Sequence, residues 1–345
     1  MYHRASISYW LNSSLFWLSM SIGMPMAHAQ WLTGEEVIMG TAIRVELWAE
    51  DKSAGEAAIA AVMEEMHRID REMSPYKPES ELSRINREAA DRPVPISAEM
   101  FDILSRSIGF SELSGGAFDI TFSSVGYMYD YRHHIKPTDK EIEAALPGIN
   151  YRHILLDADK RTVRFARPGV RIDLGGIGKG YAVDNGIALL NKRGIRQAIV
   201  TAGGDSRVLG DRRGRPWMVG IRDPRRKDNM VAVIPLVNSA ISTSGDYERY
   251  FEADGVRYHH IINPKTGRSA TGVHSVSVIG PDAITTDGLT KPVFILGPEK
   301  GLRLIESIPG VDAVIIDADG KMIYSSGLQN KQPELPHPAE STMVR

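Results

Sequence analysis

The chain has 345 residues, of which 42% are hydrophobic, so it can bury a sizeable core in one large domain or in two interleaved ones. Its 41 Lys and Arg residues nearly balance 43 Asp and Glu residues, so no overall basic charge favours nucleic acid as a partner. The absence of cysteine excludes disulfides, thiolate chemistry, cysteine-ligated metals and a lipid on an N-terminal cysteine.

Residues 1–29 have the pattern of a cleavable export signal. Arg4 precedes an apolar run centred on 15–24, and Ala27, His28 and Ala29 form the small-x-small pattern that signal peptidase accepts. The run is shorter than the roughly 20 apolar residues of a membrane span. We therefore expect a mature protein that begins at Gln30 and lies in the periplasm or is secreted, and that is not a lipoprotein.

The first half of the mature chain is expected to contain a strand and several helices. Alternating and β-branched residues predict the strand, and apolar residues at helical spacing predict a long helix after it. The predicted elements are a strand over 36–48, a helix over 53–73, a turn over 74–78, a short helix over 79–86, a helix from the Ser97 cap to about Leu113, and a short helix from Thr138.

From Tyr151 onward the pattern is rich in strands. Strands are predicted over 154–156, 162–165, a stretch that ends at Asp173, 197–201, 217–221, 230–236, 240–243, 257–262, 274–279, 313–316 and 322–324. Helices are predicted over 178–192, 283–296 and 298–308, with a kink or break at Pro292. No repeat or flexible linker interrupts residues 30–328, which favours one compact α+β body, and residues 329–345 are expected to be a disordered tail.

The stretch from Asp173 to Asp184, DLGGIGKGYAVD, is suited to binding a phosphate. Its four glycines let the backbone approach a ligand, the following helix begins with unpaired N–H donors, and Lys179 adds a positive charge. It is not a P-loop, because Gly180 stands where Ser or Thr is needed, and Val183 breaks the dinucleotide fingerprint. Taken alone, it is equally explained as a glycine-rich turn that lets a helix and a strand pack.

Four further clusters of small and polar residues lie at predicted strand ends, at 39–41, 202–205, 242–247 and 260–267. In this order and spacing, together with DLGGIGKGYAVD, they resemble the ApbE-like FAD:protein FMN transferases over about residues 36–325. The resemblance implies an α+β fold related to the tunnelling fold, with mixed or antiparallel sheets and packed helices. It also implies an enzyme that transfers FMN from FAD to a threonine or serine of a protein.

The resemblance implies a set of FAD-binding residues. Met39 and Phe118 are suited to pack on a flavin or adenine ring, Tyr76 to stack and hydrogen-bond, and Lys179 to neutralise the pyrophosphate. The full set matched to FAD contacts of the family is Met39, Tyr76, Ala117, Phe118, Asp119, Asp173, Lys179 and Ile262.

The resemblance also implies Mg²⁺, held by the carbonyl of Gly176, by Asp287 and by a hydroxyl shortly after it. The family pattern Ala-Asp-Ala-x-x-Thr would place that hydroxyl at the position of Lys291, and an ammonium group does not ligate Mg²⁺. Thr290 could take the role, water could complete the shell, or the lysine charge could partly replace the cation. We expect Mg²⁺ on Gly176, Asp287 and Thr290 or water.

His260 matches the histidine of the family and is the candidate general base, with Lys179 as the second catalytic candidate. A histidine titrates near neutral pH and can take the proton of an attacking hydroxyl. Asn263 stands where the family has Asp, which removes a charge near this histidine. A histidine that only orients substrate or bonds a strand-end carbonyl is the alternative. Asp205, Asp246 and Tyr247 are candidates for a supporting role.

The resulting hypothesis is the transfer of FMN from FAD to a Thr or Ser hydroxyl of an exported or membrane-bound redox protein, with release of AMP. The sequence does not name this acceptor protein. One alternative is an FAD pyrophosphatase, in which water replaces the protein hydroxyl and the products are FMN and AMP. Another is a non-catalytic flavin-binding assembly protein, for which Lys291 and Asn263 would mark lost chemistry.

Overall fold

The computed structural model describes residues 29–226 and 228–329. The predicted export signal, except its last residue, and the predicted tail beyond residue 329 lie outside this part of the chain. Within the described ranges, no helix combines the length and apolar character needed to cross a membrane.

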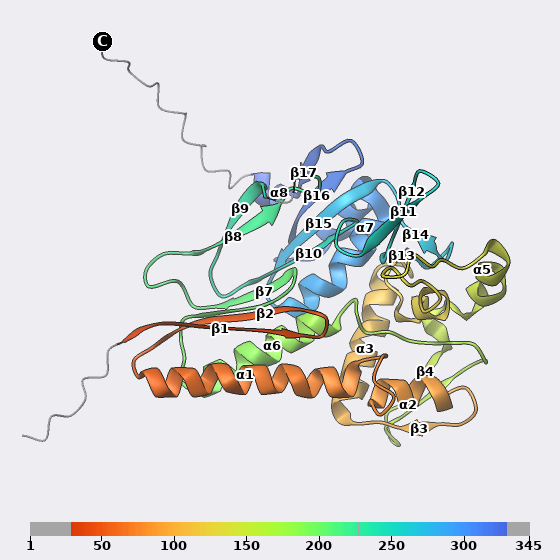
Figure 1. Ribbon diagram of the computed structural model, residues 1–345, viewed down its shortest axis with the longest axis horizontal. Helices are drawn as coiled ribbons and strands as arrows, with labels where there is room; N and C mark the ends of the chain where they lie inside the picture. Colours follow the sequence, from red (N-terminus) through yellow and green to blue (C-terminus); the bar gives the residue numbers. More distant parts are fainter. Residues whose placement is uncertain (1–28, 227, 330–345) are drawn as a thin grey trace, which may run out of the picture.

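An eight-stranded antiparallel sheet forms the centre of the molecule, with three long helices on one of its faces (Figure 1). The order of the strands is β1 (Gln30–Ile38), β2 (Thr41–Ala49), β6 (Ala198–Ala202), β7 (Asp205–Leu209), β10 (Ala240–Gly245), β15 (Val273–Gly280), β16 (Asp312–Asp317) and β17 (Met322–Tyr324). The helices are α1 (Lys52–Met73), α6 (Gly178–Lys192) and α7 (Ala283–Glu306), and α6 packs between the other two.

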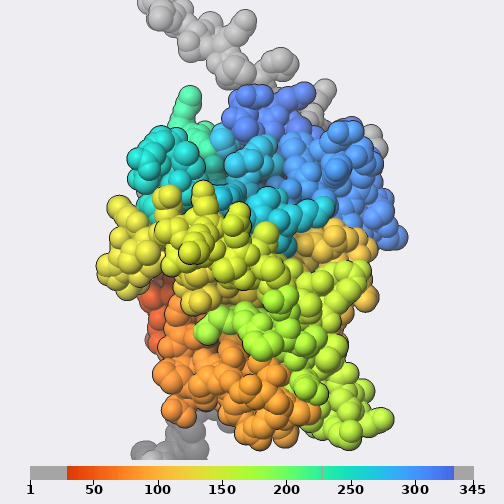
Figure 2. Space-filling model, turned by 90° about the vertical axis from the view of Figure 1, so that its right-hand side faces the viewer, coloured from red at the N-terminus to blue at the C-terminus, as the bar shows by residue number. Residues whose placement is uncertain are grey.

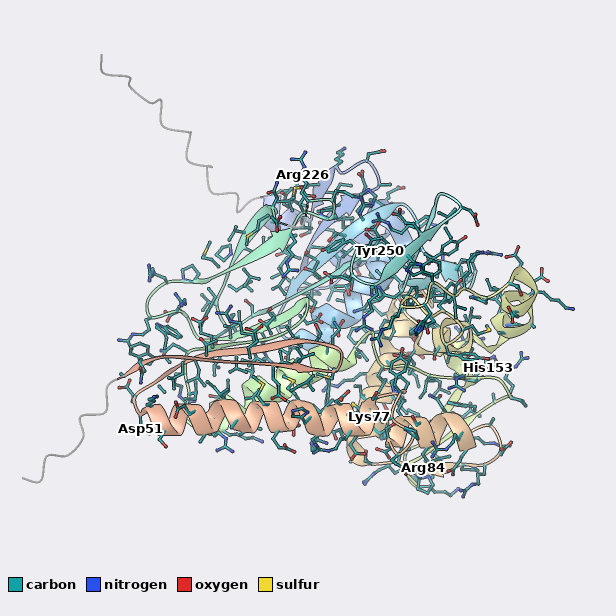
Figure 3. All side chains as sticks on the ribbon, viewed as in Figure 1. Asp51, Lys77, Arg84, His153, Arg226 and Tyr250 are labelled. Carbon is teal, nitrogen blue, oxygen red and sulfur yellow. The ribbon has the colours of Figure 1, made fainter. Side chains whose placement is uncertain are left out.

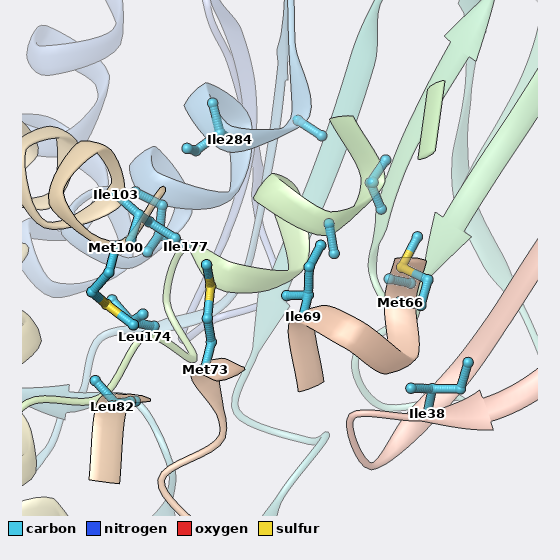
Figure 4. Packing of buried hydrophobic residues seen from close by; sticks show 14 of the residues in the cluster. Ile38, Met66, Ile69, Met73, Leu82, Met100, Ile103, Leu174, Ile177 and Ile284 are labelled. Atoms are coloured by element: carbon cyan, nitrogen blue, oxygen red, sulfur yellow. The ribbon is translucent and has the colours of Figure 1, made fainter. Parts of the chain in front are cut away.

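The main core lies between this sheet and the helices. Alternate residues of β2, among them Ile43 and Val45, are fully buried, because successive side chains of a strand point to opposite faces. Met66 and Ile69 on the apolar stripe of α1 (Figure 4) belong to the same buried hydrophobic cluster. Asp51 caps α1 by accepting a hydrogen bond from the Ala54 amide at 2.7 Å. Figure 3 shows Asp51 at one end of α1 and Lys77 just beyond the other.

The opposite face of the sheet carries the hairpin of β8 (Trp217–Arg222) and β9 (Met230–Leu236). Trp217 packs edge-on against Trp31 of β1, with ring centroids 5.3 Å apart, in a smaller hydrophobic cluster. Between this hairpin and the sheet lies a groove of about 930 Å³, lined by charged and polar side chains that include Arg44 and Thr243.

The remaining elements form a second region at one end of the sheet. Figure 2 shows the segment with α4 and α5, in yellow, between the C-terminal part above, in blue, and the region of α2 below, in orange. These elements are α2 (Glu81–Glu88), β3 (Val94–Pro95), α3 (Ala98–Leu113), η1 (Ile120–Phe122), α4 (Ser123–Gly126), α5 (Asp139–Ala145), η2 (Leu146–Gly148), η3 (Tyr151–His153), β4 (Ile154–Asp157), β5 (Thr162–Phe165), β11 (Tyr250–Ala253), β12 (Val256–His259), β13 (Ile262–Asn263) and β14 (Arg268–Ser269); α8 (Ser326–Gln329) follows β17.

The predicted α+β class is confirmed, but the strand predicted over 36–48 is wrong. It is a hairpin of β1 and β2 whose turn consists of Met39 and Gly40, with φ of 54° and 68°. Two consecutive residues with positive φ match the twist of the flanking strands. The sequence hid this turn, because Met is an unusual residue for the left-handed region.

The strand predicted before Asp173 and the kink predicted at Pro292 are also wrong. The stretch before Asp173 is extended but is not a ladder strand; the side-chain amide of Asn86 bonds the backbone of Ile172 in both directions, at 2.8 and 2.9 Å. The separation of the helices predicted over 283–296 and 298–308 is confirmed, because α7 is interrupted at Gly297, whose φ of 77° and ψ of 176° are non-helical; the additional kink or break predicted at Pro292 is wrong. A glycine adopts such a conformation without a steric penalty.

Candidate functional site

The glycine-rich turn is fixed from below by two buried side chains. Leu174 and Ile177 are 2% and 0% exposed and insert into the main core (Figure 4), so the intervening Gly175 and Gly176 stay near the surface. Gly175 donates its N–H to Asp173 Oδ1 at 2.6 Å. Burial raises the pKa of Asp173, against the opposing effects of the Gly175 N–H and of the Arg249 guanidinium.

The N-terminus of α6 follows this turn, and its donors are partly used within the protein. The amide of Gly178 bonds the Leu174 carbonyl at 2.6 Å, and the amide of Gly180 bonds Asp287 Oδ2 at 3.0 Å. A Cβ at Gly180 would lie 2.2 Å from the Ala283 carbonyl oxygen, so glycine is required for the close approach of α6 and α7. The expectation of a helix start with free donors is therefore only partly fulfilled.

Lys179 points from the first turn of α6 to Asp205, at the start of β7, and its Nζ donates to Asp205 Oδ2. The Asp205 side chain is 1% exposed. Burial opposes the charge of Lys179, but the carboxylates of Asp205 and Asp287 outweigh it and raise the pKa of the lysine. Burial and the neighbouring Asp287 raise the pKa of Asp205, while the two nearby lysines, Lys179 and Lys291, act in the other direction.

Asp287, which is fully buried on α7, lies beside this pair and has a lysine partner of its own. Lys291 Nζ donates to Asp287 Oδ1, one helical turn away, while the Gly180 amide holds Oδ2. Burial opposes the charged form of Asp287, but Lys291 and Lys179 outweigh it and hold the pKa of this carboxyl below its usual range. We call Lys179, Asp205, Asp287 and Lys291 the paired-lysine cluster.

His260 follows β12 and is half-buried, and its backbone N–H donates to the Arg249 carbonyl at 3.2 Å. Its Nδ1 is buried without a hydrogen-bond partner among the described residues. Burial, Arg249, His259 and Lys291 together lower the pKa of His260 to about 3, so its imidazole is neutral near pH 7. Lys291 of the paired-lysine cluster is thus one of the charges that act on His260.

Two predicted flavin contacts lie where a ligand can reach them. Tyr76 is 84% exposed in the turn after α1, and Met39 forms the tip of the β1–β2 hairpin. Arg249, which the sequence analysis missed, reaches the same hairpin, since its Nη2 is 3.6 Å from the position of a Cβ at Gly40. Arg249 is exposed, and no spacing pattern in the sequence marks it as part of the site.

Two other predicted flavin contacts have buried side chains. The ring of Phe118 is 3% exposed and packs against Phe110 at a centroid distance of 5.8 Å. It lies beneath Gly176, with its Cε2 3.3 Å from the position of a Cβ there, so it supports the glycine turn and cannot stack on a flavin in this conformation. Ile262 is 4% exposed within a small hydrophobic cluster, and Ala117 is 5% exposed.

The carboxylate of Asp119, another predicted flavin contact, is fully engaged within the protein. Its Oδ1 accepts hydrogen bonds from the Thr121 amide at 2.8 Å and the Thr121 hydroxyl at 2.6 Å. Its Oδ2 accepts one from the Tyr151 amide at 2.8 Å. Burial raises its pKa in spite of these bonds. The side chain therefore caps η1 and anchors Tyr151, which leaves the backbone of this segment as its possible ligand contact.

The residues predicted to hold Mg²⁺ do not fit a metal in this arrangement. Thr290 is fully buried, and its hydroxyl bonds the Asp287 backbone carbonyl at 2.8 Å and the Ser244 hydroxyl at 2.9 Å, away from the Asp287 carboxylate. Lys291 Cε lies 3.8 Å from the position of a Cβ at Gly176. In the described ranges, no group of three or more His, Asp or Glu is placed to hold a metal ion.

Asp246, a supporting candidate from the same type of sequence cluster as Asp205, belongs to a different network. Its two carboxylate oxygens accept from the fork of Arg225 at 2.8 and 2.7 Å, and His274 Nδ1 lies 3.2 Å from Oδ2. Of the two aspartates, only Asp205 joins the lysines. The second supporting candidate, Tyr247, places its ring over Gly245, where a Cβ would lie 2.2 Å from the ring.

A family model described as the ApbE family matches residues 39–315. The chain belongs to the ApbE family. A relative named FAD:protein FMN transferase from Treponema pallidum is 32% identical over 95% of this chain and 96% of its own length. One of the same name from Vibrio cholerae is 34% identical over 76% of this chain and 80% of its own length.

Solved structures of ApbE proteins share this architecture. The ApbE protein of Thermotoga maritima is 33% identical with a TM-score of 0.82, over 88% of this chain and 100% of its own. The flavin transferase ApbE of Vibrio cholerae is 28% identical with a TM-score of 0.77, over 88% and 99% of the two chains. The predicted family and fold are confirmed, and so is the enzyme class, because the relatives are named as transferases.

Proposed function

We propose that this protein transfers FMN from FAD to a threonine or serine hydroxyl of another protein and releases AMP. Membership in the ApbE family and the names of the relatives support flavin transfer. The observation that carries the proposal is the juxtaposition of Lys179 and the paired-lysine cluster with a neutral His260 beside a glycine turn. This combination provides positive charge for a pyrophosphate and a base for a hydroxyl.

The reaction exchanges one P–O bond for another. The acceptor hydroxyl oxygen forms a bond to the FMN phosphorus, and the bond between that phosphorus and the bridging oxygen breaks. AMP leaves with the electron pair of the broken bond. His260 takes the hydroxyl proton, which neutral imidazole can accept. Lys179 and exposed Arg249 stabilise the charge on the phosphate oxygens during transfer.

The predicted FAD contacts are retained in the proposal where their side chains are accessible. Tyr76 and Met39 contact the rings of FAD, while Ala117, Phe118 and Asp119 contribute backbone groups. The resemblance to the family also predicts Mg²⁺ dependence. The reaction proposed above uses no metal in any step, because the carboxylate of Asp287 is already paired with Lys291.

The acceptor is proposed to be an exported or membrane-bound redox protein, and the site of action the periplasm. The pattern of residues 1–29 supports export, and β1 begins at Gln30, the residue that cleavage would leave first. Fractionation of cells with an antibody to the chain tests this. The expected result is a shortened protein in the periplasmic fraction, and full-length protein in the cytosol would contradict it.

The activity is tested by mixing the protein with FAD and a small domain that carries one acceptor threonine, with the Thr→Ala domain as the control. The expected result is fluorescence of the threonine domain in a denaturing gel and one AMP per flavin attached. FMN and AMP without labelled domain would indicate the pyrophosphatase instead. FAD binding without any turnover would indicate a flavin-binding assembly protein.

A further inference from the structure

The centre of the site contains two buried carboxylates and two lysines. Lys179 pairs with Asp205, and Lys291 pairs with Asp287; the aspartate side chains are 1% and 0% exposed and the lysine side chains 25% and 16%. The formal charges of the four groups sum to zero. A divalent cation placed beside Asp287 would therefore add positive charge to a cluster that has no net negative charge to attract it.

All three oxygens of Asp287 already have donors within the protein. The carboxylate receives Lys291 Nζ on Oδ1 and the Gly180 amide on Oδ2. The backbone carbonyl receives the Thr290 hydroxyl at 2.8 Å and Lys291 Nζ at 3.3 Å. The ammonium group of Lys291 thus contacts two oxygens of the same residue and supplies positive charge to both.

The orientation of α7 explains why Lys291 and not Thr290 reaches the Asp287 carboxylate. Thr286 and Thr290 form one row of the helix, and their hydroxyls bond Ser242 at 2.8 Å and Ser244 at 2.9 Å on β10. Asp287 and Lys291 form the adjacent row, which faces the glycine turn and α6. Consecutive helical residues lie about 100° apart, so Thr290 cannot turn to the Asp287 carboxylate without losing its contact with β10.

Lys291 also lies where it can meet the substrate. Its Cε is 3.8 Å from the position of a Cβ at Gly176, which places the end of the side chain between α7 and the glycine turn. Lys179 approaches the same carboxylates from α6. A phosphate that enters above the turn would meet both ammonium groups, and each lysine could exchange part of its contact with a carboxylate for one with a phosphate oxygen.

We propose that the ε-ammonium group of Lys291 occupies the position of a divalent cation, so that this chain supplies from its own sequence the positive charge that neutralises the FAD pyrophosphate. This inference rests on the proposed function for its substrate. Under this proposal Lys291 replaces Mg²⁺ as the partner of Asp287, and FAD turnover by this protein does not require a divalent metal.

The experiment combines metal binding with turnover in the full-length protein. Mn²⁺ is titrated into the wild type, Lys291→Thr and Lys300→Thr, and free Mn²⁺ is measured by electron paramagnetic resonance. Lys300 lies exposed on α7 beyond the break at Gly297 and serves as the matched control. Release of AMP from FAD, with the threonine domain present, is then measured in excess chelator and after Mg²⁺ is added back.

The wild type and Lys300→Thr are expected to bind Mn²⁺ at least about tenfold more weakly than Lys291→Thr, since threonine offers an uncharged oxygen where the wild type has a cation. Turnover by the wild type should be unchanged in chelator, whereas Lys291→Thr should require added Mg²⁺. Lys291→Arg should keep turnover in chelator better than Lys291→Thr, because it retains the charge.

The proposal is overturned if the wild type binds Mn²⁺ as tightly as Lys291→Thr, or if wild-type turnover is lost in chelator and restored by Mg²⁺. Both results use the wild type, so they decide the matter even if a variant fails to fold. Absence of AMP release from the wild type under all conditions would contradict the proposed function instead. In that case the Mn²⁺ titration of the wild type and the variants still decides whether Lys291 excludes a divalent cation.

Discussion

Two networks of buried acidic groups lie near the start of β7 and the end of β10, two neighbouring central strands of the sheet, and they differ in the cations that pair with them. In the paired-lysine cluster, Asp205 and Asp287 each receive a single ammonium group on a flexible side chain. In the other network, Asp246 receives both arms of the Arg225 fork, at 2.8 and 2.7 Å, and lies 3.5 Å from Arg257.

The difference indicates which network is built to change partners. A bidentate guanidinium fixes the geometry of a carboxylate, whereas an ammonium group is a point charge that can move between neighbouring oxygens. Asp246 thus fastens the segment after β8 to the end of β10 and to β15 through Arg225 and His274. The lysines are held close to the glycine turn and remain able to contact a phosphate.

The largest effect is expected from Asp287→Asn. The amide removes the charge that pairs with Lys291, so the buried cation loses its partner and the free energy of unfolding should fall by about 3–5 kcal/mol. AMP release should fall by about a hundredfold or more, because Lys291 loses its fixed position and Lys179 loses the charge of a neighbouring carboxylate. Urea unfolding and AMP assays measure the two effects. Asp319→Asn on an exposed turn is the control. An equal loss of stability and of AMP release in that variant would show that Asp287 has no special role.

His260→Gln is expected to affect chemistry more than folding. Loss of a general base typically lowers a rate by about 10²–10⁴-fold, while FAD affinity should stay within a few-fold, because glutamine keeps a polar group of similar size. Flavin attachment and FAD binding by fluorescence titration separate the two quantities. The control is His133→Gln, with a side chain that is 68% exposed in the wild type. Attachment at the wild-type rate in His260→Gln would show that His260 only orients substrate.

The parts of the fold that the sequence predicted correctly are those that depend on local signals. The caps Ser97 and Thr138 and the start of α6 at Gly178 were predicted correctly, because each depends on residues within one turn. The hairpin at Met39 and Gly40 was missed, since its turn residues carry no strong local signal.

Within the site, the residues were predicted better than the directions of their side chains. Lys179 and Asp287 lie in one cluster although they are far apart in the sequence, and Lys291 of that cluster acts on the pKa of His260. The sequence could not show that Thr290 faces β10 while Lys291 faces the glycine turn, because this depends on the rotation of α7 against the sheet. The burial of the Phe118 ring is likewise a property of the packed core.

The pH dependence provides a smaller but more specific test of His260. Its pKa in the folded protein is lowered to about 3, so the base stays neutral and kcat/KM for FAD should show no acid limb near the ordinary histidine value of about 6.5. Between these two pH values only the unfolded chain protonates His260, so its contribution to stability is full above pH 6.5 and falls as the pH decreases toward 3. His260→Gln should reduce this slope. An acid limb near 6.5 that disappears in His260→Gln would contradict the lowered pKa.

Asp246→Asn is expected to have the smallest effect on activity and decides whether the two networks are separate. Arg225 is 38% exposed, so water compensates part of the lost ion pair, and the free energy of unfolding should fall by about 1–2 kcal/mol. AMP release should stay within about twofold, since none of the contacts of Asp246 involves a lysine of the cluster. Urea unfolding and the AMP assay, run beside Asp287→Asn, make the comparison direct. If AMP release falls in Asp246→Asn as far as in Asp287→Asn, the arginine network belongs to the site and the division between a fixed and an exchangeable network is wrong.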